Sequence, residues 1–123
     1  MRVVVFDDVL FTRRGDYDVL GVEFRFYEHA DDAVGVVDAE RPDLVLMDYA
    51  MEEHLTGEEA IEALRSRWPR GALTIVGISS DEHSNERMIA AGADDAVPKT
   101  HLRGYLRGML RRRAGGPPNG RAA

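Results

Sequence analysis

Short apolar runs alternate along this chain with segments of helical periodicity, and this alternation constrains the fold more than any other feature. Three of the runs are continuous and rich in β-branched residues, as expected of strands buried on both faces. A fourth alternates apolar with polar residues, and a fifth contains Pro98, which cannot donate to a strand ladder and so predicts a sheet edge. The predicted strands lie at residues 3–6, 22–26, 44–47, 73–78 and 96–98.

The intervening segments carry helix start and stop signals. Thr56 and Glu59 form a capping box, in which the hydroxyl and the carboxylate satisfy backbone amides at the start of a helix. Asp31 or Asp32 is the expected cap of a short helix that ends before Pro42.

Two further helices and one interrupted segment complete the pattern. Ser84 is the expected cap of a helix that stops at Gly92, because glycine accepts a left-handed backbone. An amphipathic helix over 102–113 has an apolar stripe on one face and arginines on another. In 9–21, Gly15 and Asp16 interrupt the helical pattern, so the first helix is expected to be short or broken.

The resulting order, five strands each followed by a helix, predicts an α/β fold with a doubly wound parallel sheet and helices on both faces. A chain of 123 residues is the size of one domain. The Gly/Pro-rich stretch 114–123 is expected to be a disordered tail. A cytoplasmic protein is expected, since the sequence has no cysteine, no long apolar run and no signal-peptide pattern.

Charge divides the chain into an acidic body and a basic end. Residues 1–100 carry 10 Lys and Arg against 22 Asp and Glu, whereas 101–123 carry six Arg and no acid. An arginine stripe on an acidic domain is usually a solvated face, which argues against nucleic acid as a partner. Lys99 is the only lysine beside 15 arginines, so its position invites a functional explanation.

Polar side chains follow four of the predicted strands: Asp7 and Asp8, Asp48, Ser79 and Ser80, and Lys99. In a parallel sheet these strand ends meet at one edge, where ligand sites collect. Crowded carboxylates without His or Cys predict a site for Mg²⁺, or for Mn²⁺ with the same ligand preference. The set suits phosphoryl transfer to an aspartate, with lysine and a hydroxyl binding the transferred group.

These residues resemble the receiver domains of bacterial two-component response regulators. The resemblance covers residues 1 to about 113 and rests on VVVFDD, PDLVLMD, Gly57, IVGISS, AGADD and Lys99, in that order. It implies the flavodoxin-like receiver fold, a five-stranded parallel sheet in the order 2-1-3-4-5.

The resemblance also implies roles for individual residues. Asp48 becomes the phosphoacceptor, and Asp8 and Asp48 become direct metal ligands. Asp7 binds the metal through water, and the backbone carbonyl of Ala50 is a further ligand. Ser79 and Lys99 bind the phosphoryl group, although a one-residue shift in alignment gives the hydroxyl role to Ser80.

Several positions depart from the family pattern. The loop after Asp48 reaches Gly57 one residue late, and the interval from Ser79 to Gly92 is about two residues short. Thr100 follows Lys99 where the family has a proline in a cis peptide, so a trans bond or an altered loop is expected. Ala96 replaces the aromatic residue that couples the pocket to the output face, which puts that output mechanism in doubt.

The leading function is therefore a stand-alone receiver that takes a phosphoryl group from a histidine kinase or phosphotransfer protein and signals by contact with a downstream protein. It would be a regulatory phosphoacceptor, neither an enzyme with turnover nor a membrane protein. A non-phosphorylated pseudo-receiver that binds a partner constitutively is the alternative, and a phosphatase or phosphotransferase is the third class. The sequence leaves the oligomeric state open, a homodimer included. His29, His54, His83 and His101 are expected to be separate surface residues, so a histidine metal site is not expected, although His54 is close in sequence to Asp48.

Overall fold

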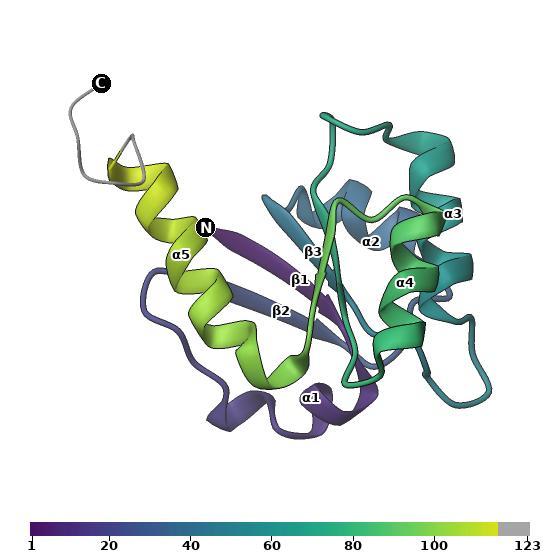
Figure 1. Ribbon diagram of the computed structural model, residues 1–123, viewed down its shortest axis with the longest axis horizontal. Coiled ribbons are helices and arrows are strands. Elements are labelled where there is room, and N and C mark those ends of the chain that lie inside the picture. The colour runs from purple at the N-terminus through teal and green to yellow at the C-terminus, as the bar shows by residue number, and fades with distance from the viewer. Residues whose placement is uncertain (116–123) are drawn as a thin grey trace.

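Five parallel strands form one sheet in the computed structural model of the chain, which describes residues 1–115 (Figure 1). The strands are β1 (Arg2–Phe6), β2 (Glu23–Tyr27), β3 (Leu44–Met47), β4 (Ile75–Ile78) and β5 (Asp95–Val97). Their order in the sheet is β2-β1-β3-β4-β5, and every pairing is parallel. The predicted fold class and strand order are confirmed.

Helices cover both faces of this sheet. They are α1 (Asp8–Thr12), α2 (Ala33–Glu40), α3 (Gly57–Arg67), α4 (Glu82–Ala91) and α5 (Leu102–Gly115), with short 3₁₀ turns at Arg14–Asp16 and Lys99–His101. α2, α3 and α4 lie on one face, and α5 with α1 on the other (Figure 1). No helix among residues 1–115 is long and apolar enough to cross a membrane.

Alternating side chains of the central strands divide the core into two apolar clusters. Val4 and Phe6 of β1 pack with α2, α3 and α4. Val3 and Val5 point the other way and pack with Leu102 and Leu106 of α5. Both faces are buried because helices cover them, which explains why these strands are continuous apolar runs in the sequence.

Several sequence predictions hold at the level of single elements. α1 has only five residues and passes into the 3₁₀ turn at Arg14–Asp16, so the first helix is broken as expected. The capping box of Thr56 and Glu59 is present at the start of α3. β5 lies at the sheet edge, and Pro98 follows its last residue.

The predicted cap of α4 is wrong. Asp81 is the cap, and Ser84 lies inside the first turn, where its amide and hydroxyl both donate to Asp81 Oδ2 at 3.0 and 2.6 Å. The helix begins earlier than predicted because the carboxylate accepts both hydrogen bonds. At α2, Asp32 occupies the cap position without a side-chain cap bond.

The ends of several elements also differ from prediction. β1, β2 and β5 differ by one residue at one or both ends, so Pro98 lies just after β5 instead of within it. β4 begins at Ile75, two residues later than expected. α5 continues through Gly115, so the first two residues of the predicted disordered tail are helical. The rest of that predicted tail, 116–123, lies outside the described residues.

Candidate functional site

The carboxyl ends of the strands meet beside α1, at the bottom of Figure 1. Among the described residues, the buried polar or charged side chains are Asp7, Asp48 and Ser79, and each directly follows a strand. Asp8 is half-buried next to Asp7, and Lys99 lies two residues after β5. Burying polar groups is costly unless they are paired, so their concentration at one edge marks this edge as the functional one.

Asp7 has a structural role in addition to its place in this site. Its Oδ1 accepts hydrogen bonds from the amides of Val9 and Leu10, both at 2.9 Å, and so caps α1. Its other oxygen, Oδ2, is buried and accepts no well-aligned hydrogen bond from the described residues.

Carboxylate oxygens of Asp7, Asp8 and Asp48 lie within 4.8 Å of one another. Lys99 Nζ is 2.8 Å from Asp7 Oδ2 and 3.4 Å from Asp48 Oδ2, so one ammonium forms ion pairs with both buried carboxylates. Three carboxylates beside one lysine leave an excess of negative charge.

This excess charge changes the proton affinity of the site. Burial, followed by the negative charge of Asp7, raises the pKa of Asp48 from 3.8 to about 6, although Lys99 and the Tyr49 amide act to lower it. Burial works to lower the pKa of Lys99, but its contacts with Asp7 and Asp48 outweigh that effect and raise it. Asp48 thus carries its charge at neutral pH at a cost in free energy.

Burial distinguishes the two candidates for the hydroxyl that would bind the phosphoryl group. Ser79 is buried, whereas Ser80 is exposed. Ser79 Oγ accepts the Asp81 amide at 3.1 Å, and its carbonyl accepts Asn85 Nδ2 at 2.9 Å. The end of β4 is therefore held by the first turns of α4, which fixes Ser79 at the site.

The loop between β3 and α3 needs glycine at its far end. The Gly57 amide donates to the Tyr49 carbonyl at 2.7 Å. A Cβ at Gly57 would lie 2.2 Å from the Asp48 carbonyl oxygen and 2.8 Å from Met88 Sδ. This close approach holds the backbone of Asp48 in place, and it explains the glycine at the start of α3. Ala50 is exposed in the same loop.

The segment after β5 also departs from the family pattern as expected. The Lys99–Thr100 peptide bond is trans. Lys99 opens the 3₁₀ turn that leads into α5, and the His101 amide donates to the Pro98 carbonyl at 2.9 Å. This turn delivers the ammonium to the carboxylates without a proline after the lysine.

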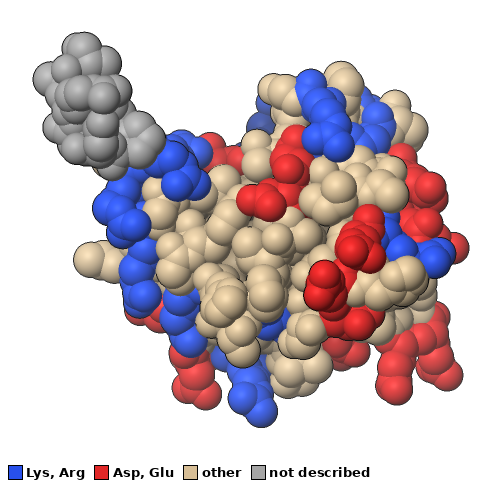
Figure 2. Space-filling model, in the orientation of Figure 1, with Lys and Arg blue, Asp and Glu red and all other residues tan. Residues whose placement is uncertain are grey.

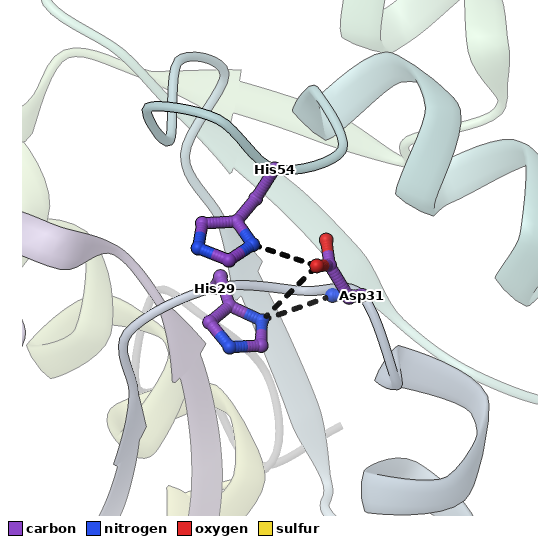
Figure 3. A group of neighbouring side chains, drawn as sticks. All are labelled: His29, Asp31 and His54. Carbon is purple, nitrogen blue, oxygen red and sulfur yellow. Dashed lines mark hydrogen bonds and ion pairs between the residues drawn. The ribbon is translucent and has the colours of Figure 1, made fainter.

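The expectation of separate histidines is wrong for two of the four. His29 and His54 stack with ring centroids 4.0 Å apart, and Asp31 lies beside both rings (Figure 3). The sheet topology could have indicated this pairing, because both residues lie in loops that follow strands and parallel strands end at the same edge. The two histidines are 25 positions apart in the sequence, so their spacing alone did not predict the contact.

Charge is only partly segregated on the face shown in Figure 2, where basic side chains also occur away from α5. Figure 2 shows basic side chains along α5 and acidic side chains around α4. The arginines of α5 lie away from the buried carboxylates, which are reached only by Lys99 among the cations of the described residues.

The site residues fit a divalent cation. The donors are carboxylate oxygens, which Mg²⁺ prefers, and no histidine lies among them. A dication would offset the charge repulsion that raises the pKa of Asp48, and Asp7 Oδ2 has spare acceptor capacity.

Comparison with known proteins gives consistent matches. The family model of the response regulator receiver domain matches residues 8–111. The transcriptional regulatory protein DegU of Brevibacillus brevis is 30% identical over 104 residues, covering 80% of this chain. The chain spans only 44% of the length of that relative.

Solved structures show the same fold at lower identity. The receiver domain of the sensor histidine kinase PA1611 from Pseudomonas aeruginosa, with a magnesium ion coordinated in its active-site cleft, has a TM-score of 0.71 at 22% identity. The match covers 90% of this chain and 94% of that one. The response regulator domain of Thermotoga maritima CheB has a TM-score of 0.68 at 22% identity, covering 91% and 94%.

Proposed function

Because the chain belongs to the response regulator receiver domains, we propose that it accepts a phosphoryl group on Asp48 from the phosphohistidine of a histidine kinase or phosphotransfer protein. The observation that carries this proposal is the buried Asp48 at the end of β3, beside two further carboxylates and the lone lysine. Residues 1–113 would form the receiver, and contact with a downstream protein would transmit the signal. A cytoplasmic location suits these partners.

The proposed metal ligands are Asp8, Asp48 and the carbonyl of Ala50, with Asp7 binding through water. Mg²⁺ suits this oxygen set, and Mn²⁺ is an acceptable substitute. The ion would neutralise charge on the oxygens of the phosphoryl group. The magnesium in the cleft of the PA1611 receiver supports the same ion here.

In the proposed reaction, a carboxylate oxygen of Asp48 attacks the phosphorus atom. An oxygen–phosphorus bond forms, the phosphorus–nitrogen bond breaks, and its electron pair returns to the donor imidazole. Lys99 would shift from Asp48 to an oxygen of the phosphoryl group, keeping its positive charge in the site. The hydroxyl of Ser79 would bind another oxygen, and its burial favours it over Ser80.

Intact-mass analysis tests this function. The purified chain is treated with acetyl phosphate and Mg²⁺, and we expect it to gain one phosphoryl group, which a chelator prevents. Asp48→Asn should gain none, whereas Asp43→Asn, just before β3, should be labelled like the unaltered chain.

A non-phosphorylated pseudo-receiver is the second candidate, favoured by Ala96 and the altered loops. It predicts no labelling and a partner affinity that beryllofluoride leaves unchanged. Labelling of the unaltered chain that is lost in Asp48→Asn would exclude it, whereas equal labelling of both proteins would refute Asp48 as phosphoacceptor. The chain is proposed as a regulatory phosphoacceptor, so it should not turn over generic phosphate esters.

A further inference from the structure

Two loops at the carboxyl edge bring a pair of histidines and an aspartate together (Figure 3). His29 and Asp31 lie between β2 and α2, and His54 lies between β3 and α3. The imidazole planes are 11° from parallel. Asp31 Oδ2 is 2.6 Å from His54 Nδ1 and 3.8 Å from His29 Nδ1. All three side chains have one donor atom within 4.8 Å of the others.

The backbone holds this group in place from both sides. Glu53 has a left-handed backbone, with φ of 61°, and the His54 amide donates to the Met51 carbonyl at 3.0 Å. This tight turn carries His54 toward the β2–α2 loop. The Leu55 amide then donates to Asp31 Oδ1 at 2.9 Å, which leaves Oδ2 directed at the imidazoles.

The contacts present do not use the full donor capacity of the group. Each neutral imidazole has one ring nitrogen with a free electron pair, and the carboxylate has several acceptor sites. The hydrogen bond between His54 and Asp31 engages one ring, and the Asp31 amide donates a long hydrogen bond of 3.4 Å to His29 Nδ1, which a bound ion would replace. That long hydrogen bond holds His29 only weakly, yet its Nδ1 also lies 3.8 Å from the carboxylate that already binds His54.

We propose that His29, Asp31 and His54 form a binding site for a first-row divalent transition-metal ion of the Zn²⁺ type. Imidazole nitrogen with one carboxylate oxygen is a donor set that Zn²⁺ accepts and that Mg²⁺ disfavours. Binding through Nδ1 requires His54 to change tautomer: the proton on Nδ1 passes to solvent and Nε2 takes one up, so the ring stays neutral while the ion occupies the Nδ1 electron pair. The ligands are Nδ1 of both rings and Asp31 Oδ2.

The required movement is small. Tetrahedral bonds of about 2.0–2.1 Å place ligand atoms roughly 3.3 Å apart, between the observed 2.6 and 3.8 Å. The rings must tilt from their parallel arrangement so that both nitrogens face the ion. The side chains are 37–43% exposed, so water completes the coordination and the ion has direct access.

This site differs in chemistry from the carboxylate site at Asp48, although both involve the β3–α3 loop. Asp48 begins that loop and His54 lies near its end. Metal binding at His54 joins the loop to the segment after β2, and so restricts the backbone that follows the proposed phosphoacceptor.

Isothermal titration calorimetry with ZnCl₂ in excess Mg²⁺ tests the site on the full chain. We expect one Zn²⁺ per chain, with His29→Gln and His54→Gln each weakening binding at least about tenfold. His83→Gln is the matched control, because His83 lies 3.7 Å from Glu86 on the surface and belongs to no group of potential metal ligands among residues 1–115. It should bind as the unaltered chain does, and so should Asp8→Asn, which changes only the carboxylate site.

Hydrogen exchange supplies a second measurement. Zn²⁺ should slow exchange of the amides in 49–56 of the unaltered chain, but not in His54→Gln. Asp31→Asn, which can keep the Leu55 hydrogen bond, should weaken binding without altering the far-ultraviolet circular dichroism. The proposal is refuted if the unaltered chain binds Zn²⁺ no better than a variant that carries both His29→Gln and His54→Gln. It is also refuted if His83→Gln or Asp8→Asn weakens Zn²⁺ binding as much as His54→Gln does. None of these readouts depends on phosphorylation of Asp48.

Discussion

Neutralising Asp48 should stabilise the metal-free fold, although it removes the proposed phosphoacceptor. The side chain is 8% exposed, and burial with the charge of Asp7 outweighs the stabilising effect of Lys99 and the Tyr49 amide on its charged form. Asp48→Asn keeps the size of the side chain and an oxygen that can accept the Tyr49 amide, which donates to Asp48 Oδ1 at 2.9 Å. The variant therefore removes charge with little change in packing.

The magnitude follows from the pKa of Asp48, which rises from 3.8 to about 6 on folding. Below both values the carboxyl is protonated in the folded and unfolded states, and the charge contributes no difference. Between them the folded state retains its proton more readily, so stability falls as pH rises. Above about pH 6 the loss reaches its full value, about 3 kcal/mol, which the Asn variant does not suffer.

Urea unfolding in the presence of a chelator, at pH 8 and near pH 3.5, measures the difference in stability between Asp48→Asn and the unaltered chain. At pH 8 we expect Asp48→Asn to exceed the unaltered chain by about 2–3 kcal/mol, and the gap should close at the acid pH. Saturating Mg²⁺ should stabilise the unaltered chain and narrow the gap at pH 8.

Asp43→Asn is a control for which the expected change in stability has the opposite sign. The Arg2 amide hydrogen bond, together with the charge of Arg113, lowers the pKa of Asp43, so neutralising it should reduce stability at pH 8. A less stable Asp48→Asn at pH 8, or a gap that does not vary with pH, would refute the reasoning about charge crowding.

Four further outcomes are expected. Gly57→Ala should lower the free energy of unfolding by about 3 kcal/mol or more, because the added Cβ would meet the Asp48 carbonyl. Gly104→Ala, where the added Cβ lies in open space on α5, should raise it by about 0.5–1 kcal/mol. Urea unfolding of the two variants measures both changes. Thr56→Ala should cost about 1 kcal/mol through loss of the α3 cap, and an unchanged melting temperature would contradict this. Mg²⁺ affinity, measured by calorimetry, should rise with pH through about 6 as Asp48 loses its proton, and a flat profile would argue against Asp48 as a ligand. Lys99→Met should slow labelling by acetyl phosphate by at least about tenfold while leaving Asp48 in place, and unchanged labelling would exclude Lys99 from binding the phosphoryl group.

Much of the fold was predictable because its signals are local. Val3–Phe6 reads as a strand from its own composition, and Thr56 with Glu59 marks a helix start through contacts three residues apart. The alternation of such elements is enough to imply a parallel sheet, because right-handed crossovers leave few other arrangements. The meeting of Asp7, Asp48 and Lys99 followed from the rule that parallel strands end at one edge.

Competition between nearby side chains was less predictable. Ser84 and Asp81 are both good caps, and only the backbone conformation shows that Asp81 accepts the hydrogen bonds. Asp31 and Asp32 present the same difficulty, since Asp31 instead binds the Leu55 amide of a distant loop. Local propensity ranks such residues almost equally, so a hydrogen bond worth about 1 kcal/mol decides between them.

The histidine group depended most on tertiary structure. Whether His29 and His54 meet is set by the turn at Glu53 and by the separation of β2 from β3, which have β1 between them. The charge balance at Asp48 has the same origin, because burial and distance determine a pKa and neither is encoded in sequence spacing. Residue types at the strand ends thus specified which chemistry was available, and packing of the loops determined which of those residues act together.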